Sequence, residues 1–261
     1  MKYGFIGCGN MGGALARALS KKTKDIMLAD FLQEKAISLA TELGVSLGTN
    51  EDIVRNCDRI FLAVKPQMME KLLASLKDIL QDKKPLLITI AAGLEIKKIE
   101  DFAGGNLPVI RIMPNTPVSV GIGLIMYTSN ELAECFVSDF VSDMEYAGTL
   151  DKLDEKLIDA GTAVSGCGPA YMYMFLEALA DGGVACGLPR DKALLYAAET
   201  MKGASELVLK SGKHPGELKD AVCSPGGSTI MGVKALEDGG LRASAVNAVI
   251  RAYERNKELG K

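Results

Sequence analysis

Apolar runs and helix-like segments alternate along the first half of the chain. The apolar runs predict strands at residues 3–7, 25–30, 58–64, 85–91 and 108–113, and residues 123–128 allow a further strand. Apolar residues recur at helical spacing within residues 12–22, 33–44, 67–80 and 95–104. Apolar strands that alternate with helices are typical of a parallel sheet covered on both faces. We therefore expect an α/β domain with a mostly parallel sheet over residues 1–150.

Strand-like runs disappear after about residue 150, and helical patterns continue to the end. Residues 154–187 predict a helix that bends or breaks near residues 166–169, where glycine and proline interrupt it. Further helices are expected after Pro189, after Pro215 and after the segment SPGGST, and residues 241–260 predict a closing amphipathic helix. This pattern predicts an all-α domain over residues 151–261.

Three features of this second domain each allow two interpretations. The run YMYMF at 171–175 faces a cofactor or forms a core or interface face, and we favour the second. His214 acts as a general base or, as its place before Pro215 favours, caps a helix. Glu177 and Asp181 share one helical face and form a carboxylate pair or, as we favour, a polar interface or solvated face.

Composition narrows the classes of function. The net charge of −3 provides no basic field for nucleic acid, and no apolar stretch is long enough to cross a bilayer. The six cysteines are scattered without a CxxC pair and there is one histidine, so we expect no metal site. The chain begins without the apolar core of a signal peptide. We therefore expect a cytoplasmic protein that binds neither nucleic acid nor membrane.

The residues GCGNMG at 7–12 form the pattern G-x-G-x-x-G between the first predicted strand and the first helix. In this pattern Gly7 permits a tight turn, Gly9 lets the backbone approach a pyrophosphate, and Gly12 lets the helix pack close to the strand. The start of the helix then offers N–H groups to the anion. The motif predicts a Rossmann-type domain that binds a dinucleotide.

Other candidate positions lie where later strands end. Asp30 follows Gly12 by 18 residues, where an acid accepts hydrogen bonds from the adenosine ribose and repels a 2′-phosphate. It is equally suited to cap the next helix. Asn50 and the runs 63–66 and 91–93 also lie near strand ends, where ligands of such sheets collect. Lys65, within the first run, is also compatible with an ordinary surface lysine.

The segment SPGGST at 224–229 interrupts a region of good helix formers. A Pro-Gly-Gly turn that opens a helix presents free backbone N–H groups, and glycine allows a ligand to approach closely. We therefore expect the amides of residues 226–229 to bind an anion. The alternative is an ordinary joint between two helices, with Ser228 or Thr229 as the N-cap.

Motifs spread over the whole chain carry a family resemblance. They include GFIGCGNMGGAL at 4–15, FLAVKPQ at 61–67, RIMPNTP at 111–117, VSGCGPAY at 164–171 and SPGGST at 224–229. In this order they resemble Δ1-pyrroline-5-carboxylate reductase. The resemblance implies reduction of the cyclic imine to L-proline by NAD(P)H, the last step of proline biosynthesis. It also implies a helical domain that interlocks with a second subunit, giving homodimers that often assemble into decamers.

The resemblance and the motifs together name the site residues. The dinucleotide is expected to touch Ile6, Gly7, Cys8, Gly9, Asn10, Met11, Gly12, Asp30, Asn50, Ala63, Val64, Lys65, Pro66, Ala91 and Ala92. The substrate is expected to meet Ser228 and Thr229, with its carboxylate at the amides of Gly226 and Gly227. Thr229 is the candidate catalytic residue, because its hydroxyl can donate to or accept from the imine nitrogen.

Two positions depart from the family pattern. Members that favour NADPH tend to have a small hydroxylated residue, such as serine, where this chain has Asp30. Some members have asparagine near the cofactor in the stretch where this chain has Ala221. Both differences favour NADH over NADPH.

Three other functions share parts of this pattern. β-Hydroxyacid dehydrogenases share the two-domain plan, but Met172 stands where those enzymes carry the lysine that acts as acid and base. Another imine reductase on the same scaffold would also use the anion site at residues 224–229. A redox sensor without activity would bind the dinucleotide and signal through its helices, but it has no need of that second site.

Overall fold

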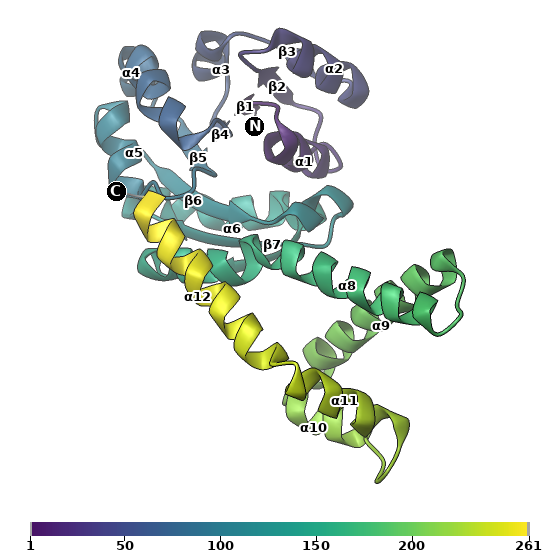
Figure 1. Ribbon diagram of the computed structural model, residues 1–261. Helices are drawn as coiled ribbons and strands as arrows, with labels where there is room; N and C mark the ends of the chain where they lie inside the picture. Colours follow the sequence, from purple (N-terminus) through teal and green to yellow (C-terminus); the bar gives the residue numbers. More distant parts are fainter. Residues whose placement is uncertain (1, 260–261) are drawn as a thin grey trace. The chain divides into compact units, whose positions relative to one another are not determined.

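The computed structural model describes residues 2–259 and divides into two compact units (Figure 1). Within the described residues, the first unit comprises residues 2–167 together with 252–259, and the second comprises Gly168–Arg251. The sequence placed the boundary at residues 150/151. Residues 151–167 belong to the compact first unit because they continue the edge strand of its sheet and then pack against that sheet.

The first unit is built on an eight-stranded sheet with the order β3-β2-β1-β4-β5-β6-β7-β8. Its strands are β1 (Tyr3–Ile6), β2 (Ile26–Ala29), β3 (Ser46–Leu47), β4 (Arg59–Leu62), β5 (Leu86–Thr89), β6 (Val109–Pro114), β7 (Gly123–Ser129) and β8 (Gly148–Lys152). All neighbouring pairs are parallel except β6 and β7, which are antiparallel. The expected mostly parallel sheet is confirmed.

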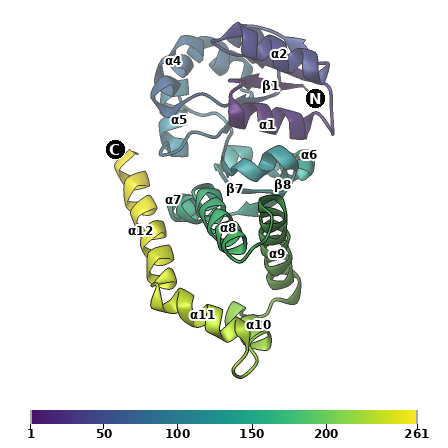
Figure 2. The same ribbon diagram turned by 45° about the vertical axis from the view of Figure 1, so that its right-hand side comes forward.

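Helices cover both faces of this sheet. They are α1 (Asn10–Leu19), α2 (Gln33–Leu43), α3 (Asn50–Asn56), α4 (Pro66–Lys83), α5 (Ile96–Ala103), α6 (Glu134–Asp143) and α7 (Ile158–Gly161). One apolar cluster joins α1, α2 and α6 to the sheet, and a second joins α3, α4 and α5 to the other face. Figure 2 shows α4 and α5 side by side. The sequence prediction of helices on both faces is therefore confirmed.

Some boundaries differ from the sequence prediction, and two strands were missed. The first helix begins at Asn10 and ends at Leu19, not at residues 12 and 22. The missed strands are β3, which consists of two residues that are both exposed, and β8, a largely exposed edge strand of sequence GTLDK. Neither has the apolar run by which a buried strand is recognised.

The second unit contains helices only, which confirms its predicted class. They are α8 (Gly168–Ala185), α9 (Arg190–Ser211), α10 (Pro215–Ala221), α11 (Ser228–Asp238) and the first part of α12 (Leu241–Leu259). The single helix expected over 154–187 is interrupted by a π-helical turn at Thr162–Gly166, and α8 starts after it with Pro169 in its first turn, where proline is tolerated. Among residues 2–259, no helix is long and apolar enough to cross a membrane.

Candidate dinucleotide and substrate sites

The glycine-rich loop after β1 is held by two close backbone approaches. Gly7 has φ +108°, and a Cβ at this position would lie 2.5 Å from the carbonyl oxygen of Ala63. A Cβ at Gly12 would collide with the carbonyl oxygen of Gly7. Both glycines are therefore required by sterics, and they bring the start of α1 against the ends of β1 and β4.

Gly9 is a different case, because no atom lies within 4 Å of the position that its Cβ would occupy. It is the N-cap of α1, and no side chain caps this helix. The first N–H groups of α1 therefore have no side-chain cap and lie at the positive end of the helix dipole, beside the open space at Gly9. These features fit a pyrophosphate, as the sequence motif predicts.

Asp30 braces the loop from the end of β2. Its carboxylate accepts hydrogen bonds from the backbone N–H of Cys8 at 2.6 Å and of Leu32 at 2.8 Å. The N-cap of α2 is Leu32, so the interpretation of Asp30 as a helix cap is wrong. The carboxylate instead links the glycine-rich loop to the end of β2, and a contact with the ribose stays a prediction.

Cys8 is buried beside this carboxylate, and its thiol donates to the carbonyl oxygen of Ala29 at 3.5 Å. Burial, and then the charge of Asp30, raise the pKa of the Cys8 thiol to about 12. The thiol is therefore neutral near pH 7, and Cys8 acts here through its backbone and its packing rather than as a nucleophile.

A surface hollow of about 510 Å³ lies between α1 and the first turns of α2. It is lined by Cys8, Gly9, Asn10, Arg17, Glu34, Lys35, Ser38 and Leu39. The sequence analysis missed the last five of these residues. Four of them are exposed polar residues of amphipathic helices, and such a pattern by itself indicates only a solvated surface. The sequence feature that could have identified them is the position of α2 directly after Asp30.

The other predicted dinucleotide residues lie along the same edge of the sheet. The strand order reverses between β1 and β4, where ligands of doubly wound sheets bind. The backbone N–H of Ala63 donates to the carbonyl oxygen of Ile6 at 2.9 Å and so joins the ends of β1 and β4. Val64 is the next residue along the chain. Exposed Lys65 is the N-cap of α4, with Pro66 next.

Three further predicted positions complete this edge. Asn50 is the first residue of α3, and a capping box between Thr49 and Asp52 stabilises the start of this helix. Ala91 is buried and Ala92 is exposed just after β5, and Met11 is half-buried in the first turn of α1. The structure therefore gathers the predicted residues of the first unit at the carboxyl ends of β1, β2, β4 and β5 and at the helix starts beside them.

The segment SPGGST opens α11 in the second unit. Gly226 has φ +69°, a conformation that favours glycine, and Gly227 is the N-cap of α11. Ser228 and Thr229 are the first two residues of the helix, so the alternative in which one of them is the N-cap is wrong. Because a glycine provides no capping side chain, the first N–H groups of α11 are left to another acceptor.

The remaining candidates of the second unit have structural roles. The Nδ1 atom of His214 accepts from the backbone N–H of Gly216 at 3.1 Å, which confirms the capping interpretation. Asp181 forms an exposed ion pair with Arg190 rather than a carboxylate pair with Glu177.

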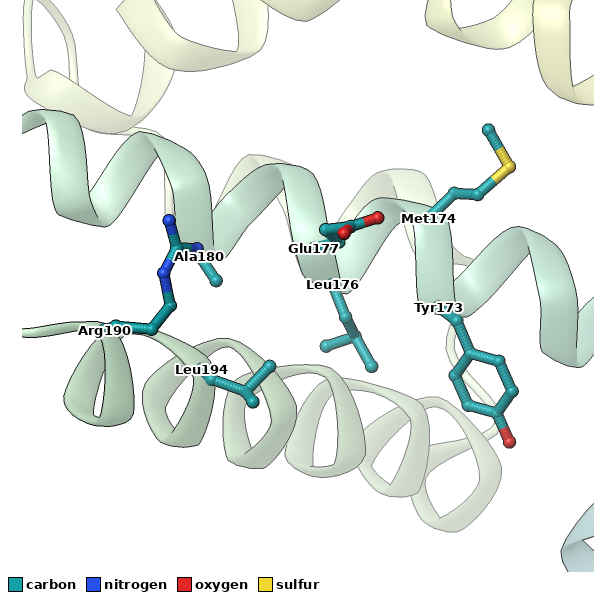
Figure 3. A pocket seen from close by; sticks show the side chains of 7 residues that line it. All are labelled: Tyr173, Met174, Leu176, Glu177, Ala180, Arg190 and Leu194. Carbon is teal, nitrogen blue, oxygen red and sulfur yellow. The ribbon is translucent and has the colours of Figure 1, made fainter.

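A hollow of about 490 Å³ lies between α8 and α9 (Figure 3). Leu176 and Leu194 face each other between the two helices, whereas Met174 points away from α9. Within the run at 171–175, Met172, Tyr173 and Met174 are 48–71% exposed. They therefore do not form a core within this chain, which is compatible with the interface interpretation.

Comparisons with known proteins agree with this arrangement. The family model "NADP oxidoreductase coenzyme F420-dependent" matches residues 2–93, and the model "Pyrroline-5-carboxylate reductase dimerisation" matches residues 155–259. A pyrroline-5-carboxylate reductase of Pisum sativum is 41% identical over 262 residues, which cover 98% of this chain and 95% of the relative. This chain belongs to the pyrroline-5-carboxylate reductase family.

Solved structures of family members share the fold over the whole chain. The pyrroline carboxylate reductase of Plasmodium falciparum with NADP bound is 35% identical, with a TM-score of 0.87, and the match covers 100% of this chain and 98% of that one. The pyrroline-5-carboxylate reductase of Coxiella burnetii is 32% identical, with a TM-score of 0.91 and the same coverage. The chain is thus an NAD(P)-dependent oxidoreductase by family, with a dimerisation domain whose family model begins at residue 155.

Proposed function

We propose that this protein reduces Δ1-pyrroline-5-carboxylate to L-proline with a hydride from NAD(P)H, the last step of proline biosynthesis. The observation that carries the proposal is 41% identity over 98% of the chain to a pyrroline-5-carboxylate reductase. Two open helix starts, one after the glycine-rich loop and one after SPGG, support it from the structure, because the reaction needs two anionic molecules held at once.

The dinucleotide half of the reaction belongs to the first unit. The N–H groups at the start of α1 would hold the pyrophosphate, with the space at Gly9 left free for it. Asp30 would accept from the adenosine ribose and disfavour a 2′-phosphate, so we propose a preference for NADH. When bound, the nicotinamide supplies the hydride; the protein binds, orients and keeps water away.

The substrate half belongs to the second unit. The N–H groups at the start of α11 would bind the carboxylate, and the open space beside Gly226 leaves room for it to approach. The hydroxyl of Thr229 would contact the imine nitrogen. As hydride adds to the imine carbon, the electron pair of the C=N bond moves to the nitrogen, which already carries a proton in the iminium form. The product is the secondary amine of proline.

Assembly and location are part of the proposal. The family model of residues 155–259 describes dimerisation, and the apolar side chains that the second unit exposes support a homodimer. Association of such dimers into a decamer is the larger assembly that the family resemblance suggests. A reducing cytoplasm suits the six free cysteines.

The first test follows loss of reduced nicotinamide absorbance with Δ1-pyrroline-5-carboxylate and either NADH or NADPH, and identifies the product. Turnover to L-proline is expected, with a higher kcat/KM for NADH. Tight dinucleotide binding without turnover would refute the reductase and favour another imine substrate or a sensor. A higher kcat/KM for NADPH would refute the role given to Asp30, and Asp30→Ser should shift the ratio towards NADPH.

A substitution tests the proposed catalytic residue. Thr229→Val keeps the shape of the side chain and removes the hydroxyl, so turnover should fall by about 10- to 1,000-fold while NADH binding persists. Thr229→Ser, which keeps a hydroxyl, is the matched control and should retain most of the activity. Unchanged turnover in Thr229→Val would remove Thr229 from the mechanism.

A further inference from the structure

The sheet of the first unit contains a buried arginine that is not among the predicted site residues. Arg111, in the middle of β6, has a side chain that is 2% exposed. Its Nη1 donates to the carboxylate of Glu155 at 3.1 Å, and its Nη2 lies 3.5 Å from that of Asp159. Its Nε has no hydrogen-bond partner among the described residues. A buried guanidinium in this state depends strongly on the carboxylates that remain to it.

The same oxygen of Glu155 has a second role. It accepts from the backbone N–H of Ile96 at 2.7 Å, and Ile96 is the first residue of α5. The N-cap of this helix, Glu95, makes no side-chain capping bond. Glu155 therefore caps α5 from 59 residues away, with its negative charge at the positive end of the helix dipole.

This cap fixes the end of the loop at residues 91–95, which leads from β5 to α5. The loop begins at the predicted cofactor residues Ala91 and Ala92 and turns through Gly93, which has φ +75°. Asp30 and the hollow beside α2 lie on the β2 side of β1, whereas β4 and β5 lie on the other side. A dinucleotide with its adenosine on the β2 side therefore extends its nicotinamide towards β4 and β5.

We propose that Glu155, held by Arg111, is a positioning residue that sets the loop at residues 91–95 for the nicotinamide end of the cofactor. This inference rests on the proposed function. Glu155 is the first residue that the dimerisation family model matches, and the inference assigns it a role in the dinucleotide site of the first unit.

The test compares NADH with ADP-ribose, which lacks the nicotinamide, by calorimetry on the whole protein. Glu155→Ala removes both the cap of α5 and one of the two carboxylate partners of Arg111. It should leave the Kd of ADP-ribose within about 2-fold, while NADH binding and kcat each weaken by about 10- to 100-fold. Glu155→Gln keeps an acceptor for the Ile96 N–H and should lose less. Glu134→Gln, at an exposed ion pair with Lys152, is the matched control and should change neither.

Two results would overturn the inference: unchanged NADH binding and kcat in both Glu155 variants, or equal weakening of NADH and ADP-ribose, which would indicate general loss of structure. Should Glu155→Ala not fold, Glu155→Gln still decides between these outcomes. Absence of imine reduction by the unaltered protein would refute the proposed function alone, because the comparison of the two ligands needs no turnover.

Discussion

The two units of this chain bury their apolar residues to very different degrees. The first unit encloses two large clusters, which contain Phe5 and Phe61 stacked at 4.3 Å and every central strand of the sheet. Among the described residues of the second unit, the buried apolar side chains are those of Ala180, Ala193 and Ala197. Larger ones, such as Leu209 at 78% exposed and Met174 at 71%, face outwards.

This difference teaches that the first unit has the core of an independently folding domain and the second does not. Exposed apolar surface on this scale marks an interaction site in soluble proteins. The family model over residues 155–259 describes dimerisation, which supports the proposal that a second copy of the chain covers this surface.

The largest effect is expected in the core of the first unit. Phe61→Ala removes a fully buried ring and leaves a cavity, so the free energy of unfolding should fall by about 3–5 kcal/mol. Leu209→Ala, in exposed α9, should change the unfolding of the first unit by less than about 0.5 kcal/mol. Urea denaturation, followed by a signal from the first unit, measures the change in unfolding free energy for both variants. Equal losses would contradict the contrast between the units.

A charge on the exposed apolar face of α8 should act on assembly instead. Met174→Glu places a carboxylate where the proposed homodimer buries apolar surface, so association should weaken by roughly 2–4 kcal/mol. Sedimentation equilibrium would detect monomers, and unfolding of the first unit should be unchanged. Ser75→Glu adds the same charge to the exposed face of α4 and is the control. Intact dimers in Met174→Glu would exclude this face from the interface.

A substitution in the glycine-rich loop separates open space from packing within the first unit. Gly9→Val projects a side chain where no atom lies within 4 Å, and the backbone there is extended, so stability should be retained. The side chain would occupy the space proposed for the pyrophosphate, and NADH affinity should fall about 10- to 100-fold, or roughly 1.4–2.7 kcal/mol. Fluorescence titration tests this, and unchanged affinity would place the cofactor elsewhere.

The smallest effect concerns the buried thiol of Cys8. Its pKa in the folded protein is about 12, above its ordinary value of 9.0, so the folded state holds this proton more tightly than the unfolded state. Its contribution to stability is complete below pH 9 and is lost as the pH rises from about 9 to 12. The difference in unfolding free energy between the native protein and Cys8→Ala should therefore narrow between about pH 7.5 and 10. If urea denaturation gives the same difference in unfolding free energy across this pH range, the raised pKa of Cys8 is refuted.

Local pattern was enough to predict much of the fold. Apolar runs identified β1, β2, β4, β5 and β6, because a strand that is buried on both faces is apolar at most of its positions. The short or exposed strands β3 and β8 carry no such signal, and they form because a neighbouring strand supplies hydrogen bonds. The steric need for Gly7 and Gly12 was also readable, since the motif encodes a turn within a few residues.

The sequence by itself determined the class of both units, the glycine-rich loop and the helix start after SPGG, because each depends on residues that are close in the chain. Only the tertiary structure decided that Asp30 braces Cys8 rather than capping α2, and that Glu155 caps a helix which begins at Ile96. It also decided that the apolar faces of α8 and α9 stay uncovered within one chain. Periodicity shows that a helix has an apolar face, but the surface that covers this face depends on packing between distant segments or between chains.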